Sequence, residues 1–469
     1  MKYISTRKKA PDLNFSDVIL QGLASDGGLY IPGYLPKFSP KEIANFAKLS
    51  YQELAFKVIS PFVAGEIENS ELKSIIDKSY ASFSHQAIAP TKQLSSNQFL
   101  LELFHGPTLA FKDFALQLLG NLFEYILNKR NEEVVIIGAT SGDTGSAAID
   151  GCKHCKHAKI FILHPYERVS DVQRRQMTTI LADNVTNIAL KGDFDDCQSF
   201  VKKMFISQDF LKGKRMVAVN SINWARIVAQ IVYYFYCGAR MNLQNGVSFS
   251  VPTGNFGDVY AGYLAKQMGL PVKKLIVATN KNDILTRFFN ENDYSRGTLI
   301  ETLSPSMNIQ VSSNFERYLF DLHHGDKRDI KHSEVYDIMK NFEEKGGIKI
   351  SHERLEVARK SFASYSVDDD ETCSLIADLF HKTGEVLDPH TAIGVGAALK
   401  YEQHKDYSGE QIVTLATAHP AKFPESIHKA GLKEPALPES LADLFDKDEK
   451  MEILDKDLDV VKKFIADKI

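Results

Sequence analysis

The sequence places one lysine, Lys112, between a polar turn and an amphipathic helical pattern. The apolar run Phe99–Phe104 predicts a strand, the turn His105–Asp113 follows it, and apolar residues at helical spacing come next. An ammonium group at a helix start among apolar neighbours is disfavoured by the helix dipole and by desolvation, and both lower a lysine pKa. Such a lysine can act as an amine nucleophile or form a Schiff base. In the alternative interpretation, Lys112 reaches solvent and pairs with Asp113.

A second turn, Gly138–Gly145, follows the apolar run Val134–Ile137 and precedes a helical pattern. Its glycines and the hydroxyls of Thr140, Ser141 and Thr144 can place backbone N–H groups and short polar side chains at a helix N-terminus. That arrangement is an anion site for a carboxylate or a phosphate. No lysine follows a glycine at the spacing of a P-loop. A glycine turn that serves only tight packing is the alternative.

A third turn, Gly254–Asp258, follows the segment Val247-Ser-Phe-Ser-Val251 and precedes the helical pattern Val259–Met268. Its two glycines predict a second anion cradle made of backbone donors. The turn lacks both the glycine spacing and the later acidic residue of a dinucleotide-binding fingerprint. We therefore interpret it as a phosphate cradle of another kind.

The fourth turn begins at Thr417, directly after the apolar run Gln411–Ala416, and Pro420 stops the strand there. Because open α/β sheets bind ligands outside the carboxyl ends of their strands, this hydroxyl can reach a ligand over the sheet. A threonine that merely ends a strand is the alternative.

A lysine, two anion cradles and a hydroxyl at one sheet edge fit pyridoxal phosphate better than a nucleotide. This cofactor needs a lysine partner, a phosphate cup and a partner for its pyridine nitrogen.

The elements that must position these turns alternate along the chain. From about residue 98, an apolar strand pattern, a polar turn and an amphipathic helix recur, which predicts an α/β fold with a mainly parallel sheet. The 469 residues allow two to four domains, at roughly 100–200 residues per domain. The 56 basic and 60 acidic residues give a net charge of −4, which favours neither nucleic acid nor an anionic membrane as a partner.

No apolar run is long enough to span a membrane and no signal-like segment opens the chain, so we expect a cytoplasmic protein.

The five cysteines are unevenly spaced, as is typical of reduced thiols. Cys152 and Cys155 with His157 superficially suggest a zinc or redox site. No second ligand pair follows at zinc-site spacing, so we favour a structural role and predict no metal.

Eight segments in a fixed order carry a resemblance to the threonine synthases, which are fold type II pyridoxal phosphate enzymes similar to the tryptophan synthase β chain. These segments are Tyr3–Arg7, Gly22–Tyr30, His105–Asp113, Gly138–Gly145, Asn220–Arg226, Gly254–Asp258, Asp388–Thr391 and Thr417–Phe423. The first two look like those of the longer threonine synthases with an elaborated N-terminal domain. The resemblance runs nearly from end to end.

The resemblance implies a role for each turn. Lys112 becomes the lysine that holds the cofactor and the main proton shuttle, and Thr417 faces the pyridine nitrogen. The loop that binds the cofactor phosphate consists of Gly254, Asn255, Phe256, Gly257 and Asp258. The loop that holds the substrate carboxylate contains Thr140, Ser141, Asp143 and Thr144. The segment that contacts the substrate phosphate contains Asn220, Ser221 and Arg226.

Two of these assignments leave alternatives open. Many fold type II relatives have asparagine where this chain has Asp143. An ionised carboxylate there would repel the cofactor's 3′-oxygen unless one of the two is protonated. Arg226 suits phosphate by its charge and forked donors, but it could instead form a surface or interdomain salt bridge.

The resemblance also implies the architecture. Two open, mainly parallel sheet subdomains would face each other across a cleft, accompanied by an N-terminal domain and a helical insertion. The expected parts are an N-terminal domain over 1–93, a catalytic core over 94–279 and 386–440, a small, mostly helical insertion over 280–385, and a C-terminal helical tail over 441–469.

The implied activity is the last step of threonine biosynthesis. A β,γ-elimination and replacement on pyridoxal phosphate would convert O-phospho-L-homoserine and water to L-threonine and phosphate. A phospho-lyase that releases 2-oxobutyrate, a serine/threonine dehydratase or β-replacement synthase, and a nucleotide-dependent kinase or binding module are the competing hypotheses. We expect a small-molecule substrate, neither nucleic acid nor membrane as a partner, and a monomer or homodimer. For His105, His390 and His419 we favour packing roles.

Overall fold

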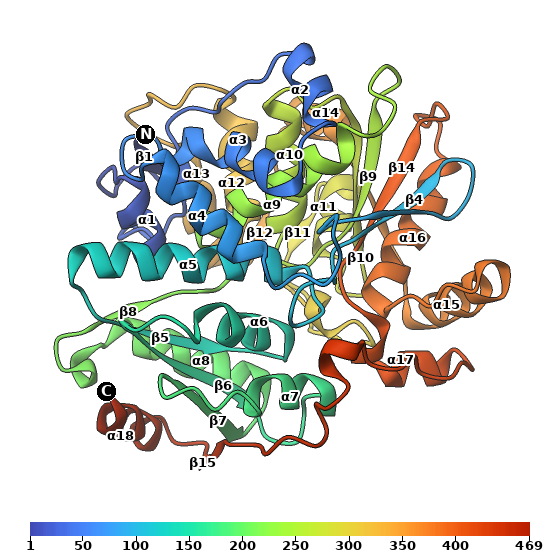
Figure 1. Cartoon of the computed structure of the whole chain (residues 1–469). Coiled ribbons are helices and arrows are strands. Elements are labelled where there is room, and N and C mark those ends of the chain that lie inside the picture. The colour runs from blue at the N-terminus through green and yellow to red at the C-terminus, as the bar shows by residue number, and fades with distance from the viewer.

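Two open sheets dominate the computed structural model, which describes residues 1–469 (Figure 1). The large sheet has six strands in the order β13-β10-β9-β14-β4-β3, and β3 alone runs antiparallel to its neighbour. In that order the strands are Phe362–Ser366, Val272–Thr279, Val247–Pro252, Gln411–Ala416, Gln98–Glu102 and Thr91–Gln93. The expected fold type II architecture, with two mainly parallel sheets, is confirmed.

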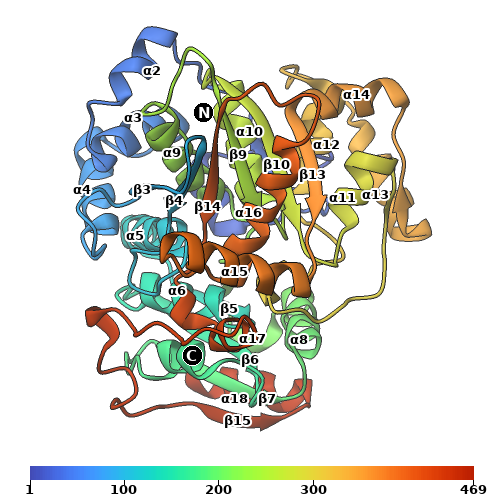
Figure 2. The same cartoon turned by 90° about the vertical axis from the view of Figure 1, so that its right-hand side faces the viewer.

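The small sheet has five parallel strands in the order β15-β7-β6-β5-β8. They are Glu452–Asp455, Val185–Lys191, Ala158–Pro165, Val134–Ala139 and Arg215–Val217. Figure 2 shows the small sheet below the large one, with helices on the faces of both. The unbroken apolar run Val134–Ile137 predicted β5, as is typical of a strand covered on both faces. The strands β9 and β14 are also buried almost throughout, but serine, threonine and glutamine interrupt their apolar residues.

Helices α5 (Lys112–Arg130), α6 (Asp143–Cys152) and α9 (Trp224–Gly238) join the two sheets. In Figure 1, α5 lies between the upper part of the molecule and the small sheet. It packs against both α6 and α9, and α9 is buried at every position. Helices α7 (Asp171–Thr178) and α8 (Phe194–Ile206) flank the small sheet, and α10 (Gly257–Gln267) follows β9.

The N-terminal segment forms an antiparallel pair of short strands, β1 (Tyr3–Ser5) and β2 (Tyr30–Pro32), and four helices. The helices are α1 (Phe15–Gln21), α2 (Pro40–Phe46), α3 (Tyr51–Val63) and α4 (Asn69–Tyr80). Their apolar faces pack on α9 and α5 and share one continuous core with the rest of the chain. Residues 1–93 are therefore not separately packed, and their last strand, β3, belongs to the large sheet.

Segment 280–385 is mostly helical, as expected, but it also supplies a strand to the large sheet. Its helices are α11 (Ile284–Glu291), α12 (Phe315–His324), α13 (Glu334–Lys345), α14 (His352–Ser361) and α15 (Asp369–Thr383), with a two-stranded pair of β11 (Tyr294–Ser295) and β12 (Gly347–Ile348). The strand β13 pairs in parallel with β10 at the edge of the large sheet. In an edge strand of five residues, the alternation of apolar and polar side chains is too short to predict a strand from the sequence.

The C-terminal part returns from the large sheet to the small one. Helix α16 (Pro389–Glu402) packs on the large sheet, and α17 (Pro424–Lys429) leads into the tail. The tail was expected to be helical, but only α18 (Leu458–Lys468) is a helix, and β15 extends the small sheet. We propose the four parts expected from the sequence as the domains of the chain. The strands β3, β13 and β15 lie outside the expected catalytic core but pair with its two sheets. Short 3-10 helices cover Asp209–Leu211, Pro305–Met307, Pro420–Lys422 and Glu439–Leu441.

None of the helices combines the length and the apolar character that crossing a lipid bilayer would require.

Candidate active site

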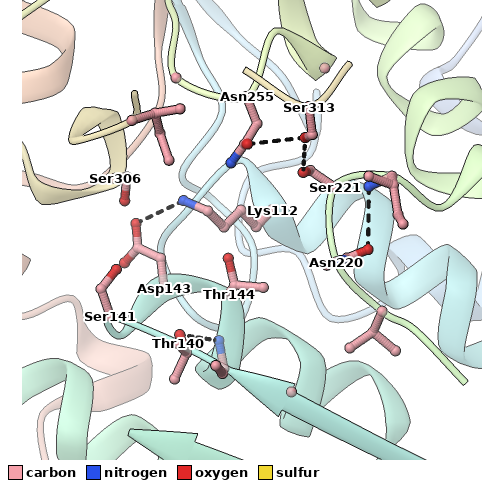
Figure 3. Close-up of a pocket in the computed structure, with 18 of the residues that line it drawn as sticks. Lys112, Thr140, Ser141, Asp143, Thr144, Asn220, Ser221, Asn255, Ser306 and Ser313 are labelled. Atoms are coloured by element: carbon pink, nitrogen blue, oxygen red, sulfur yellow. Dashed lines mark hydrogen bonds and ion pairs between the residues drawn. The ribbon is translucent and has the colours of Figure 1, made fainter. Parts of the chain in front are cut away.

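A cavity of about 470 Å³ lies where the carboxyl ends of the two sheets face each other. All of the site residues predicted from the sequence line it, and Figure 3 shows ten of its lining side chains labelled. The predicted residues are Lys112, Thr140, Ser141, Asp143, Thr144, Asn220, Ser221, Arg226, Gly254, Asn255, Phe256, Gly257, Asp258 and Thr417. Four predicted turns thus meet in one place, together with the segment after β8.

Lys112 is the first residue of α5 and is buried. Its Nζ atom lies 3.1 Å from Asp143 Oδ2 (Figure 3). The same atom lies 4.7 Å from the centre of the Phe111 ring. Burial lowers the pKa of Lys112, although the Asp143 charge opposes this effect. The alternative pairing with Asp113 is wrong, because Asp113 instead accepts hydrogen bonds from the Thr108 backbone N–H and hydroxyl.

Asp143 is the first residue of α6 and the most highly connected carboxylate of the cavity. Oδ2 accepts from Lys112, while Oδ1 lies 2.8 Å from Lys422 Nζ and accepts from Gln173 Nε2 at 2.8 Å. Burial would raise the pKa of Asp143, but the charges of the two lysines outweigh it and hold this pKa well below its usual range. The carboxylate is therefore ionised, and two ammonium groups balance its charge.

The turn between β5 and α6 is built around Thr140. Its hydroxyl oxygen accepts hydrogen bonds from the backbone N–H groups of Gly142 at 2.9 Å and Gly145 at 2.8 Å. Gly142 has a φ of 137°, a conformation that favours glycine. Thr140 thus shapes the turn, whereas Ser141 and Thr144 are half-buried, line the cavity and form no side-chain hydrogen bond within the protein.

The loop between β9 and α10 approaches its neighbours closely. A Cβ atom on Gly254 would lie 2.8 Å from the Ser306 carbonyl oxygen, so only glycine fits. Phe256 has a φ of 60°, which is strained for an aromatic residue, and α10 begins directly after it. Backbone N–H groups at the start of α10 therefore border the cavity.

Asp258 faces two tyrosines from inside α10. It accepts hydrogen bonds from the hydroxyls of Tyr233 at 2.6 Å and Tyr234 at 2.9 Å. Burial raises the pKa of Asp258 to about 6, and the two tyrosine hydrogen bonds limit this rise. The side chain anchors the start of α10 to α9.

Thr417 is held by its backbone. Its carbonyl oxygen accepts from the Phe111 N–H at 2.8 Å, and its own N–H donates to the Thr391 hydroxyl at 3.2 Å. Asp388 in turn accepts from the Thr391 hydroxyl. The Thr417 hydroxyl has no partner within the protein and lines the cavity.

Arg226 is a buried cation without a carboxylate partner. It is 4% exposed, its Nη1 donates to the Val219 carbonyl oxygen at 3.1 Å, and its Nε has no hydrogen-bond partner. Burial lowers its pKa to about 10. The alternative of a salt bridge is wrong, since no acidic group lies within 4.0 Å of the guanidinium. A buried, unpaired charge on a cavity wall is costly unless an anion binds beside it.

The remaining predicted residues are tied to the loop of β9 and α10 through Ser313. Its hydroxyl donates to Asn255 Oδ1 at 3.0 Å and lies 3.4 Å from the Ser221 hydroxyl (Figure 3). Asn220 precedes Ser221 and lines the same wall.

Three comparisons with known proteins indicate the same family. Residues 2–80 match the family described as threonine synthase N terminus, 85–352 match pyridoxal-phosphate dependent enzyme, and 391–465 match threonine synthase, C-terminal. A threonine synthase of Pseudomonas aeruginosa is 56% identical over 468 residues, which cover 99% of this chain and 98% of the relative. The chain belongs to the threonine synthase family.

Solved structures of threonine synthases share the whole fold. The pyridoxal-phosphate-bound threonine synthase of Brucella melitensis superposes with a TM-score of 0.95 and 45% identity, covering 100% of this chain and 99% of the other. The yeast threonine synthase gives a TM-score of 0.93 and 40% identity, covering 100% and 98%. The predicted cofactor, pyridoxal phosphate, is thereby confirmed.

The cavity of this threonine synthase family member has the donor set that pyridoxal phosphate needs. It offers the buried amine of Lys112, the N–H groups at the start of α10, and a free hydroxyl on Thr417. The glycine at position 254 leaves no room for a side chain where the loop passes Ser306. The residues present therefore fit the cofactor.

The sequence did not point to several residues of the site. Lys422 lies in Thr417–Phe423, one of the eight segments that carry the resemblance, but no local sequence pattern indicates that it contacts Asp143. Gln173 and Ser313 lie in segments without any motif. His390, for which the sequence favoured a packing role, also lines the cavity: its Nε2 accepts from the Ser306 N–H at 3.3 Å, and its Nδ1 lies 2.8 Å from Asp388.

Proposed function

We propose that this chain converts O-phospho-L-homoserine and water to L-threonine and phosphate. Arg226 carries the proposal, because a buried guanidinium without a carboxylate partner shares one cavity with the buried amine of Lys112. A substrate with both an amino acid group and a phosphate would satisfy both ends of that cavity. The relative from Pseudomonas aeruginosa, 56% identical and named threonine synthase, supports threonine as the product.

We assign the cofactor to one group of residues. Lys112 would hold it covalently, Thr417 would face its pyridine nitrogen, and the loop Gly254–Asp258 would bind its phosphate through backbone donors. In this loop the side chains of Asn255 and Asp258 are engaged with Ser313 and two tyrosines, which leaves the backbone N–H groups for the phosphate.

We assign the substrate to the facing turns. Ser141 and Thr144, together with the start of α6, would bind the substrate carboxylate, while Thr140 and Asp143 hold the turn in shape. Arg226, with Asn220 and Ser221, would bind the substrate phosphate. Because these two groups come from different segments that line one cavity, they would give the substrate a single direction.

The chemistry then follows from these positions. When bound, pyridoxal phosphate supplies an electron sink for the carbons next to the substrate amine. Lys112 would remove and return protons, and burial favours this role because it lowers the pKa of the amine. Arg226 stabilises the negative charge that grows as phosphate leaves. Burial of both groups strengthens these interactions, because little water screens them.

Replacement of Arg226 tests the assignment. Arg226→Ala should raise KM for O-phospho-L-homoserine by about 10- to 100-fold, the usual cost of a lost hydrogen bond to a charged group. Binding of a phosphate-free amino acid of the same chain length should change far less. Arg215→Ala removes an exposed guanidinium that pairs with Glu132 and is the matched control. Equal weakening of both ligands by Arg226→Ala would contradict the phosphate role.

We further propose that the protein works in the cytoplasm on this small molecule alone, as a monomer or homodimer, without nucleic acid or membrane partners. The net charge of −4 supports this, since it gives no field toward polyanions. Sedimentation velocity of the full chain distinguishes monomer from dimer, and a larger assembly would contradict the proposal.

A further inference from the structure

Lys422 is a fully buried lysine that the proposed reaction has not used. It ends the 3-10 helix Pro420–Lys422, five residues after Thr417, and its side chain is 0% exposed. Nζ donates to the Thr108 carbonyl oxygen at 2.7 Å and lies 2.8 Å from Asp143 Oδ1. A buried ammonium loses its hydration even when it is paired, so a buried ion pair adds little to stability. The position of Lys422 beside Asp143 therefore calls for another explanation.

Lys112, which lines the cavity, and Lys422, which lies behind Asp143, bind different oxygens of the same carboxylate. Lys112 lies 3.1 Å from Oδ2 of Asp143, whereas Lys422 and Gln173 contact Oδ1. The lysines therefore do not compete for one position. Asp143 can lose the contact with Lys112 and still keep an ammonium and an amide donor.

We propose that Lys422 is a positioning residue of this site: it supplies the permanent counter-charge of Asp143, so that Lys112 can become neutral without leaving a buried carboxylate unpaired. The inference rests on the proposed function insofar as Lys112 must act as a base. Without Lys422, each loss of a proton from Lys112 would strand the Asp143 charge in an apolar environment. Lys112 would then hold its proton more tightly.

Four other ionisable groups lie around the pair, and the two that are cations beside Lys112 act in this direction. Those that face Lys112 and Asp143 from packed elements are Lys422 of the 3-10 helix, Arg226 of α9, Asp258 of α10 and His390 of α16. After the effect of burial, the charges of Lys422 and Arg226 both lower the pKa of Lys112. Removal of Lys422 should therefore raise that pKa.

Two readouts test the proposal on the full chain. In the cofactor-loaded protein, the pH dependence of the visible absorption band reports the protonation of the nitrogen that Lys112 contributes. In the cofactor-free protein, acetylation of Lys112 by acetic anhydride, followed by peptide mass spectrometry, reports the neutral amine. Neither readout needs substrate or turnover, so both stand even if O-phospho-L-homoserine is not the substrate.

Three variants give the expected pattern. Lys422→Met should move both midpoints upward by about one pH unit, which makes acetylation of Lys112 about tenfold slower at a fixed pH below its pKa. Lys422→Arg, which keeps the charge, should stay near the wild type. The double variant Lys422→Met with Asp143→Asn removes both charges and should return toward the wild-type midpoint.

Circular dichroism and thermal unfolding check that each variant is folded. A folded Lys422→Met protein in which Lys112 titrates as in the wild type would overturn the proposal. A double variant whose midpoint stays as far from the wild type as that of Lys422→Met would overturn it as well, because a merely structural lysine would not be rescued by loss of its partner's charge.

Discussion

Gly120 of α5 and Gly151 of α6 lie against each other where the two helices cross: a Cβ atom on Gly120 would be 1.9 Å from the Gly151 carbonyl oxygen. Lys112 begins α5 and Asp143 begins α6, so each reactive residue lies about two helical turns before its glycine. The close crossing therefore sets the separation of the helix starts, at which the two side chains meet at 3.1 Å.

Gly120→Ala should separate α5 from α6 and disturb both stability and turnover. Inserting a methyl group into a packed contact costs about 1–3 kcal/mol, and the helix starts should shift with it. We expect a lower thermal midpoint and a lower kcat. Gly347→Ala is the control, because its Cβ would meet Ser295 at an ordinary 3.5 Å. A Gly120→Ala protein with the wild-type midpoint and kcat would show that the crossing does not position the site.

Lys112→Ala should abolish turnover and the covalent attachment of the cofactor. The amine is the nucleophile and the proton shuttle of the proposed site, and no other lysine that lines the cavity is buried. Borohydride reduction followed by peptide mass spectrometry should find the cofactor on Lys112 of the wild type and on no residue of Lys112→Ala. Lys129→Ala, on the exposed end of the same helix, should behave like the wild type. Activity of Lys112→Ala near the wild-type level would reject the assignment.

Asp258 should make the folded protein less stable as the pH rises. Burial raises its pKa from 3.8 to about 6, so between these values the folded chain binds more protons than the unfolded chain. Its contribution is therefore most favourable below pH 4 and falls as the pH approaches 6, by on the order of 3 kcal/mol.

The comparison with Asp258→Asn isolates this effect. The variant cannot titrate at this position but keeps an oxygen that accepts from Tyr233 and Tyr234. Scanning calorimetry between pH 4 and pH 6.5 should show the wild type losing stability relative to the variant as the pH increases. A stability difference that is constant over this range would contradict the raised pKa.

The sequence predicts those parts of the fold and the site that depend on local patterns. The strand β14 has the predicted bounds Gln411–Ala416, and α5 starts at Lys112. Buried parallel strands are short apolar runs, and ligands bind at their carboxyl ends, so the turns that follow them could be assembled into one site in advance.

Contacts between distant segments could not be predicted in this way. Asp143 and Lys422 meet only because the chain returns from β14 past the start of α6, and no local pattern records that meeting. Arg226 was expected near the substrate, but its lack of a carboxylate partner is a property of the packed structure. The edge strands β13 and β15 are short and half-exposed, so their pattern is too weak to distinguish them from loops.

The products formed from O-phospho-L-homoserine distinguish a threonine-forming enzyme from a lyase. The cofactor-loaded protein is incubated with O-phospho-L-homoserine, and phosphate, threonine and 2-oxobutyrate are measured in the same samples. We predict threonine equal to phosphate, because Lys112 and Arg226 act on one substrate in one cavity. Phosphate matched by 2-oxobutyrate would make the protein a lyase, and no release of phosphate would contradict the assigned substrate.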